Sequence, residues 1–185
     1  MRDKKNVLSD ALNGVKTVVL DLDGTLYNKA GLSTRMVRRL WWCLPMMAID
    51  RLSRGGRCWR WIISTRWHRE VYLATMAELI GQYQPRRENV LELVAECHQR
   101  QIPIAIYSDY GAVAEKLNAL KIDPNQFDRI ITAPDLGGLK PTKVCAQRVL
   151  ELMNAQPETT LFIGDRDEKD GAAARSVGAR FLHIQ

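Results

Sequence analysis

Residues 15–26 read VKTVVLDLDGTL, and this stretch decides the fold. The largely β-branched run 15–20 predicts a short, buried strand. It leads directly into Asp21 and Asp23, and Gly24 lets the chain turn sharply after them. Ligands of open α/β sheets bind outside the carboxyl ends of the strands. Two carboxylates at this position are therefore candidates for a functional site.

Four later stretches have the same short, apolar character, and helical patterns lie between them. The predicted strands are 102–107, 129–132, 160–163 and 181–184, and the predicted helices are 88–100, 112–120, 141–153 and 172–177. Strands that alternate with helices predict an α/β fold with a mostly parallel sheet covered on both faces.

Residues 30–85 interrupt this alternation. Apolar residues recur every four positions from Met36 to Leu52, which predicts a helix that starts near Ser33 and is kinked at Pro45. Two more helices are predicted near 59–67 and 71–80, the last ended by Gly81. About 55 residues are too many for a simple connection. We therefore expect a core domain of residues 1–29 and 86–185, and a small all-helical subdomain of residues 30–85 inserted after the first strand.

Polar residues also follow the other predicted strands. They are Ser108-Asp109, the stretch Gly137–Pro141 that contains Lys140, and Gly164-Asp165 with Asp170 shortly after. Parallel strands would bring these ends to one edge of the sheet. Oxygen ligands from Asp21, Asp23 and Asp165 suit a hard cation there, and Ser108 and Lys140 suit phosphate oxygens. Each feature alone also occurs in ordinary turns, caps and loops, so the prediction depends on their order and their shared position after strands.

Composition excludes several classes of protein. The chain has 185 residues and a net charge of +6. No apolar run reaches the roughly 18 residues of a bilayer span, and the N-terminus lacks the apolar segment of a secretory signal. The four cysteines show neither a CxxC pair nor zinc spacing. The sequence predicts a cytoplasmic protein with reduced thiols and no transmembrane segment.

Four motifs stand in order along the chain: DLDGTL at 21–26, IAIYS at 104–108, Lys140-Pro141, and GDRDEKD at 164–170. With these motifs the chain resembles the haloacid dehalogenase superfamily of hydrolases over nearly its whole length. The resemblance implies a Rossmann-like, three-layer core. The inserted segment is similar to the type-one helical cap of phosphoglycolate phosphatase-like members.

The resemblance implies roles for the motif residues. Asp21 would be the nucleophile that forms an aspartyl-phosphate, and Asp23 the general acid and base. Mg²⁺ would be held by the Asp21 carboxylate, the Asp23 backbone carbonyl and Asp165.

Ser108 and Lys140 would bind phosphate oxygens, and Asp170 would orient Lys140 or metal-bound water. Asp109 stands where the family commonly has asparagine, and residues 166–169 form an unusually charged loop. Whether Asp167 in this loop shares in metal binding stays open.

These roles predict a Mg²⁺-dependent phosphatase that hydrolyses a phosphate monoester of a small molecule. A phosphomutase or phosphotransferase of the same family is an alternative, because the same carboxylate pair serves both reactions. A non-catalytic binding or regulatory module is another. Dehalogenation is disfavoured, because a halide needs no acid and the dehalogenases lack an aspartate at the position of Asp23.

The inserted segment is chemically distinct. Residues 31–70 contain nine arginines, only Asp50 and Glu70 as acids, and all five tryptophans, giving +7 against −1 for the rest. The simplest interpretation is a tryptophan core under a solvated arginine face. Alternatives are a phosphorylated substrate with a hydrophobic or aromatic part, an anionic membrane surface, and, least favoured, nucleic acid.

Overall fold

The computed structural model describes residues 10–54 and 56–184. The chain divides into two compact units. The first comprises residues 1–28, 86–109 and 125–185, and the second comprises residues 29–85 and 110–124. The second unit therefore includes residues 110–124, which the sequence assigned to the core. The predicted domain limits themselves stay a prediction.

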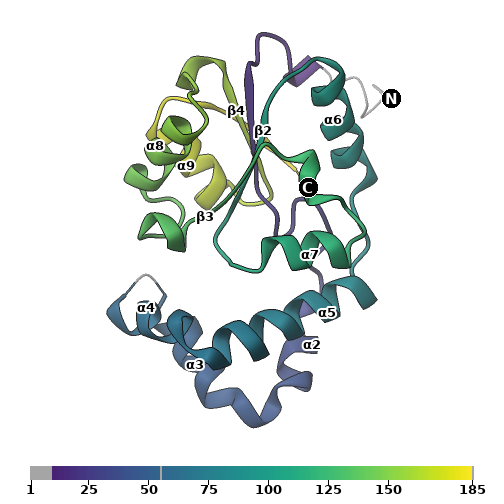
Figure 1. Ribbon diagram of the computed structural model, residues 1–185. Helices are drawn as coiled ribbons and strands as arrows, with labels where there is room; N and C mark the ends of the chain where they lie inside the picture. Colours follow the sequence, from purple (N-terminus) through teal and green to yellow (C-terminus); the bar gives the residue numbers. More distant parts are fainter. Residues whose placement is uncertain (1–9, 55, 185) are drawn as a thin grey trace. The chain divides into compact units, whose positions relative to one another are not determined.

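A five-stranded parallel sheet organises the first unit (Figure 1). Its strands are β1 (Thr17–Leu20), β2 (Ile104–Ser108), β3 (Arg129–Thr132), β4 (Thr160–Gly164) and β5 (Arg180–His183), in the order β3-β2-β1-β4-β5. In register, Val19 of β1 lies opposite Ala105 on one side and Phe162 on the other. The α/β prediction is confirmed, with strand limits that differ by at most two residues from those expected.

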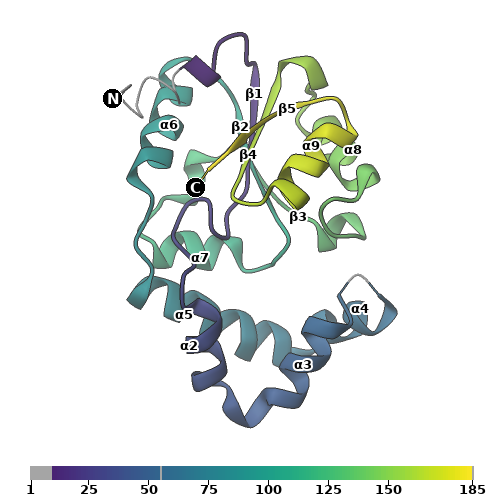
Figure 2. The ribbon, with the colours of Figure 1, turned by 180° about the vertical axis from the view of Figure 1, so that it is seen from behind.

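Helices flank this sheet on both sides. They are α6 (Glu88–Gln99), α8 (Lys143–Leu152) and α9 (Ala172–Ser176). Figures 1 and 2 show α8 and α9 on one side of the sheet and α6 on the other. Single turns at Pro124–Gln126, Pro134–Leu136, Pro157–Thr159 and Asp167–Gly171 complete the connections.

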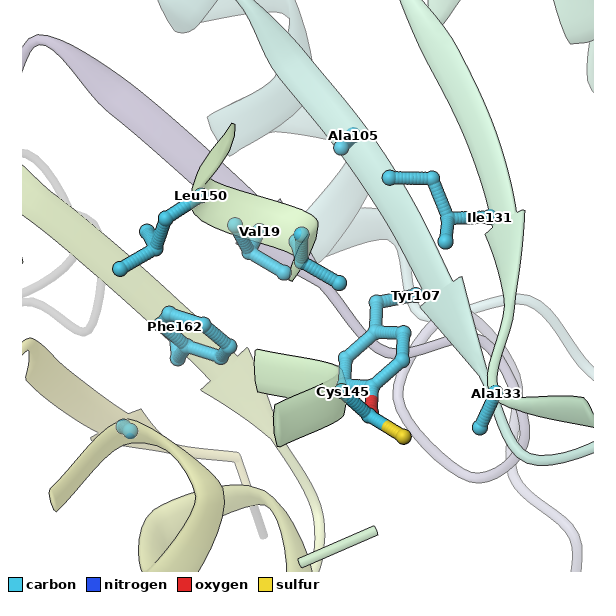
Figure 3. Packing of buried hydrophobic residues seen from close by; sticks show 10 residues of the cluster. Val19, Ala105, Tyr107, Ile131, Ala133, Cys145, Leu150 and Phe162 are labelled. Carbon is cyan, nitrogen blue, oxygen red and sulfur yellow. The ribbon is translucent and has the colours of Figure 1, made fainter. Parts of the chain in front are cut away.

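The core between the sheet and helices α8 and α9 fixes the strand ends. Because successive strand residues point to opposite faces, alternate residues of four strands meet the helices. The buried cluster consists of Val19, Ala105, Tyr107, Ile131, Ala133, Cys145, Val149, Leu150, Phe162 and Ala174 (Figure 3). Each large side chain buried here contributes about 1.5–3 kcal/mol. The packing of this cluster thus holds the carboxyl ends of β1, β2 and β4 in fixed positions.

The second unit is helical throughout its described elements. It contains α2 (Leu32–Arg39), a turn at Trp41–Cys43, α3 (Leu44–Leu52), α4 (Arg57–Ser64), a π-helical segment Trp67–Leu73 that runs into α5 (Ala74–Tyr83), and α7 (Val113–Ala119). The predicted kink at Pro45 is wrong, because the helix breaks at Leu40. Pro45 lies in the first turn of α3, where its missing N–H removes no helical hydrogen bond.

Gly81 does not end the third predicted helix, since α5 continues to Tyr83. A Cβ atom at Gly81 would lie 3.0 Å from the carbonyl oxygen and 3.1 Å from the Cβ atom of Ala119 in α7. The absence of a side chain at Gly81 therefore allows two helices of the same unit to approach closely.

The tryptophans of the second unit divide into two groups. Trp59 is buried and Trp67 is half-buried. Trp41, Trp42 and Trp61 are exposed by 67%, 58% and 60%. The interpretation that the tryptophans form the core of this unit is wrong for these three. Aliphatic residues such as Met36, Leu40, Ile62 and Ile80 are buried there.

Among the residues that the structure describes, no helix combines the length and the hydropathy needed to span a bilayer.

Candidate active site

Asp21 and Asp23 lie on the turn that directly follows β1. The backbone N–H of Asp21 donates to the carbonyl of Ile163 at 2.8 Å, which continues the pairing with β4 for one residue. Gly24 then adopts a φ of +106°, a conformation that favours glycine. The hydroxyl of Thr25 reaches back and donates to Oδ2 of Asp21 at 3.0 Å. The local sequence thus fixes the Asp21 carboxylate at the sheet edge.

Lys140 joins three parts of the site. Its buried ammonium donates to Oδ1 of Asp21 at 2.5 Å, to Oδ1 of Asp170 at 2.6 Å and to the carbonyl of Tyr107 at 3.0 Å. All three N–H groups of the ammonium therefore have acceptors. An ammonium shared by two carboxylates holds them together and offsets part of their repulsion.

Burial and charge shift the pKa values of this pair. Burial raises the pKa of Asp21 to about 7, with Lys140 opposing the shift and Asp170 adding to it. Burial disfavours the charged ammonium of Lys140, but the carboxylates of Asp21 and Asp170 still raise its pKa above the ordinary value. Lys140 is therefore a cation at neutral pH, and further positive charge near Asp21 would favour the ionised carboxylate.

The Asp23 carboxylate is held from two sides. The hydroxyl of Tyr27, a fully buried residue, donates to Oδ1 at 2.5 Å, and the hydroxyl of Ser108 donates to Oδ2 at 3.1 Å. Ser108 is the last residue of β2, so this contact joins the ends of two neighbouring strands. Two donors fix the orientation of the carboxylate.

Three carboxylates converge near the ends of β1 and β4. One oxygen each from Asp21, Asp165 and Asp170 lies within 4.8 Å of the others. Asp170 packs against Gly164, where an added Cβ atom would come within 2.4 Å of its side chain. Carboxylate oxygens grouped in this way are suitable ligands for a hard divalent cation such as Mg²⁺. The side chain of Asp23 does not belong to this group.

The charged loop after β4 pairs with Asp109. Oδ1 of Asp109 accepts the backbone N–H of Lys140 at 2.8 Å, and its Oδ2 accepts the Lys169 ammonium at 2.8 Å. The Arg166 guanidinium lies 3.8 Å from the same oxygen. The negative charge of Asp109 is thus offset by cations from the loop itself.

Asp167 lies outside the carboxylate cluster. Its oxygens accept two hydrogen bonds from the Arg175 guanidinium, at 2.7 and 3.1 Å. The side-chain hydrogen bond from Arg175 lowers the pKa of Asp167 below its usual value. Asp167 is therefore engaged in a surface ion pair.

The structure gathers the residues singled out by the sequence into two adjoining groups. Asp21, Asp165, Asp170 and Lys140 form one, and Asp23 with Ser108 forms the other. Sequence reasoning missed Tyr27, Thr25 and Lys169. Tyr27 and Thr25 each follow their aspartate by four residues, a spacing that could have suggested contact across the turn.

Comparisons with known proteins identify relatives of this chain. A family model described as haloacid dehalogenase-like hydrolase matches residues 15–178. Over 107 residues the chain is 34% identical to the pyrophosphatase PpaX of Bacillus mycoides, a match that covers 58% of this chain and 48% of that protein. The matched part therefore spans about half the length of the curated relatives.

Solved structures share the fold at low sequence identity. A HAD phosphatase from Thermococcus onnurineus has a TM-score of 0.68 at 17% identity, covering 92% of this chain and 86% of that one. CbbY from Rhodobacter sphaeroides, solved with xylulose-(1,5)bisphosphate, has a TM-score of 0.68 at 18% identity, with 90% and 84% covered. At such identities the likeness concerns the fold.

Proposed function

Because the chain belongs to the haloacid dehalogenase-like hydrolases, we propose that it is a Mg²⁺-dependent phosphatase acting on a phosphate monoester of a small molecule. The observation that carries the proposal is the junction at Lys140, whose ammonium bonds to both Asp21 and Asp170. This arrangement presents a buried, oriented carboxylate beside a fixed positive charge, as a nucleophile toward phosphorus requires.

The donor set at the sheet edge fits a divalent cation. The carboxylates of Asp21 and Asp165, with the backbone carbonyl of Asp23, would hold Mg²⁺. The cation would offset the repulsion between the nucleophile and an anionic phosphate. Asp170 is engaged by the Lys140 ammonium and by the backbone N–H of Arg166 at 3.2 Å, so its assigned part is to position Lys140.

In the first step a carboxylate oxygen of Asp21 attacks phosphorus and the bond from phosphorus to the ester oxygen breaks. Asp23 gives its proton to the departing alkoxide, which leaves as the alcohol. The product on the enzyme is an aspartyl-phosphate at Asp21. Tyr27 holds the Asp23 carboxyl group in one orientation for this transfer.

In the second step water attacks the phosphorus of the aspartyl-phosphate. Asp23, now a carboxylate, takes the proton from that water, and the bond between phosphorus and Asp21 breaks. Inorganic phosphate leaves, and both aspartates return to their starting states. The net change is one ester bond hydrolysed by one water.

Ser108 and Lys140 would stabilise the phosphate oxygens in different ways. The Ser108 hydroxyl can rotate from Asp23 toward a phosphate oxygen, since a hydroxyl carries one mobile hydrogen. All three N–H groups of Lys140 are already engaged. Its assigned contribution is therefore its charge, together with the orientation of Asp21.

Hydrolysis of an aryl phosphate, with and without Mg²⁺, tests the proposal. Wild type should turn over the ester only with the metal, and Asp21→Asn should lose turnover because an amide is a poor nucleophile. Asp167→Asn is the matched control, because it removes a carboxylate of the same loop that pairs with Arg175 on the surface. Its activity should stay near that of wild type.

Pyrophosphate and a panel of phosphorylated metabolites should be assayed beside the aryl ester, because PpaX is named a pyrophosphatase. Metal-dependent turnover that survives in Asp21→Asn would contradict the assigned nucleophile. If the protein binds Mg²⁺ but hydrolyses none of these compounds, a non-catalytic module is favoured. Labelled water distinguishes a hydrolase from a phosphotransferase, because a hydrolase transfers the labelled oxygen of water to the released phosphate.

A further inference from the structure

The outer face of α3 and the turn before it form an apolar surface on the second unit. Its residues are Trp41, Leu44, Pro45, Ala48, Ile49 and Leu52, and all six are exposed. We call these six residues the exposed stripe. Trp41 is 67% exposed and Leu52 is 87% exposed. At about 100° per residue, the five helical members lie on one face of α3.

The opposite face of α3 is turned inward, with the half-buried Met46 and Met47 on either side of the buried Asp50. Asp50 is 2% exposed, and its carboxylate pairs with the Arg54 guanidinium at 3.2 Å and lies 4.0 Å from Nε2 of His68. The helix therefore buries the carboxylate of Asp50 within its own unit and leaves the apolar side chains of Leu44, Ile49 and Leu52 exposed. Contiguous apolar surfaces left in this way mark sites of interaction with proteins or membranes.

Two exposed arginines lie close to the exposed stripe in the sequence. Arg38 lies in the last turn of α2 and Arg51 lies in α3 beside Leu52, and both are exposed. Neither is paired with a carboxylate among the described residues. The sequence 31–69 contains only one acid, the buried Asp50. This part of the surface therefore combines apolar area with positive charge.

We propose that the exposed stripe docks on an anionic lipid membrane. Tryptophan and aliphatic side chains would enter the headgroup and acyl boundary while arginines pair with lipid phosphates. A second copy of the chain fits less well, because a symmetric contact would bring the same arginines together. Nucleic acid fits less well too, because five of the six stripe residues are not aromatic and offer no face for stacking bases. The proposal concerns a peripheral contact and is independent of the reaction.

Sedimentation with phospholipid vesicles tests this inference. The full chain should pellet with vesicles of phosphatidylcholine mixed with phosphatidylglycerol, and far less with phosphatidylcholine alone. Added salt should weaken binding, because surface charges are screened. Trp41→Gln/Leu52→Gln should lower the partition coefficient by about tenfold or more, because two apolar side chains that would move from water into the membrane have been removed. Arg38→Gln/Arg51→Gln should lower it by about fivefold for each arginine.

Matched controls come from the first unit. Val144→Ser removes another exposed apolar side chain, and Arg129→Gln removes another exposed arginine. Both should bind as wild type does. The substituted stripe residues are exposed, and circular dichroism checks that each variant is folded. Leu52→Gln alone provides a milder variant, with a smaller expected loss of binding.

Three results would overturn the proposal. The first is that wild type does not pellet with anionic vesicles. The second is that Trp41→Gln/Leu52→Gln binds them as well as wild type does. The third is a concentration-dependent dimer, measured by light scattering, that the double variant loses while no form of the protein binds vesicles. That result would assign the exposed stripe to self-association.

Discussion

Tyr27 is a positioning residue in the proposed mechanism, because its hydroxyl donates to Oδ1 of Asp23 at 2.5 Å. Tyr27→Phe keeps the ring in its buried site and removes the hydroxyl. We expect kcat to fall by about tenfold with a smaller change in KM, as is usual when a group that orients a reacting residue is lost. Steady-state kinetics on the best ester, with the pH profile of kcat, measures the effect.

Tyr107 provides a matched control for loss of a buried hydroxyl. Its hydroxyl is buried and makes no hydrogen bond among the described residues. Tyr107→Phe removes an unsatisfied polar group and keeps the ring near Lys140, so stability should be equal or higher. If Tyr27→Phe and Tyr107→Phe have equal kinetics, Tyr27 does not position Asp23.

Gly164 is the second residue whose substitution tests the site. A Cβ atom there would come within 2.4 Å of Asp170, whose carboxylate holds Lys140. Gly164→Ala should displace Asp170 and lower kcat by about 100-fold, the effect of a shift of about 1 Å in catalytic groups. Kinetics and a thermal melt on the same sample separate loss of function from loss of fold.

Gly178→Ala is the matched glycine control. Gly178 has a φ of +77° and open space around its Cβ position. Its substitution should cost about 1 kcal/mol of stability through backbone strain and leave kcat near wild type. If Gly164→Ala and Gly178→Ala lose activity equally, a side chain at position 164 does not act by displacing Asp170.

At the residue scale, the sequence predicted the groups that follow strands and missed those that support them. Asp21, Asp165 and Ser108 were found because strand ends are visible in the hydrophobic pattern. Lys169 was not assigned a partner, because its contact with Asp109 joins residues 60 positions apart in the sequence. Such pairings depend on side-chain geometry in three dimensions, which one sequence does not specify.

At the scale of elements, the crossing of α5 and α7 depends on Gly81. Alanine in an exposed helix would stabilise by about 0.5–1 kcal/mol relative to glycine. Here the added Cβ atom meets the carbonyl oxygen of Ala119 at 3.0 Å, and overpacking costs about 1–3 kcal/mol. Gly81→Ala should therefore lower the free energy of unfolding by about 1 kcal/mol, as measured by urea denaturation. A gain in stability would show that the two helices separate at little cost.

The strands were predicted well and the inserted helices less well, for one physical reason. A fully buried strand is recognised by its local apolar run. In α3 Leu44, Ile49 and Leu52 are exposed and Asp50 is buried, so a rule that turns apolar residues inward and polar residues outward fails. The break at Leu40 and the π-helical segment 67–73 were not predicted either. The local sequence contains no separate signal for them.

At the scale of the whole molecule, the stability of the metal-free protein should depend on the ionisation of Asp21. Its pKa is raised from 3.8 to about 7, mainly by burial. The folded state thus binds this proton more tightly than the unfolded state. The contribution of protonated Asp21 to the free energy of unfolding is therefore complete below about pH 4, and it is lost as pH rises through about 7. The loss is on the order of a few kcal/mol, at about 1.4 kcal/mol per tenfold change in proton affinity.

Urea denaturation from pH 4 to 8 in the presence of a chelator measures this loss, with Asp21→Asn as the reference. Burial lowers the pKa of His68, so this residue destabilises the fold as pH falls and acts in the opposite direction. It is present in both proteins, so the difference between them isolates Asp21. Wild type should lose stability relative to the variant as pH rises. A parallel pH dependence would contradict a buried carboxylate that titrates near neutrality.

The same titration predicts how Mg²⁺ should act on the fold. A cation at Asp21 and Asp165 binds the ionised carboxylate and competes with the proton, so it should stabilise wild type more at pH 8 than at pH 5. Asp165→Asn should reduce this gain, and Asp167→Asn, which alters only a surface pair, should retain it. Thermal melts with and without Mg²⁺ at the two pH values measure the effect without any substrate. Equal stabilisation of all three proteins would place the cation elsewhere, because the cluster at the ends of β1 and β4 would then not be its site.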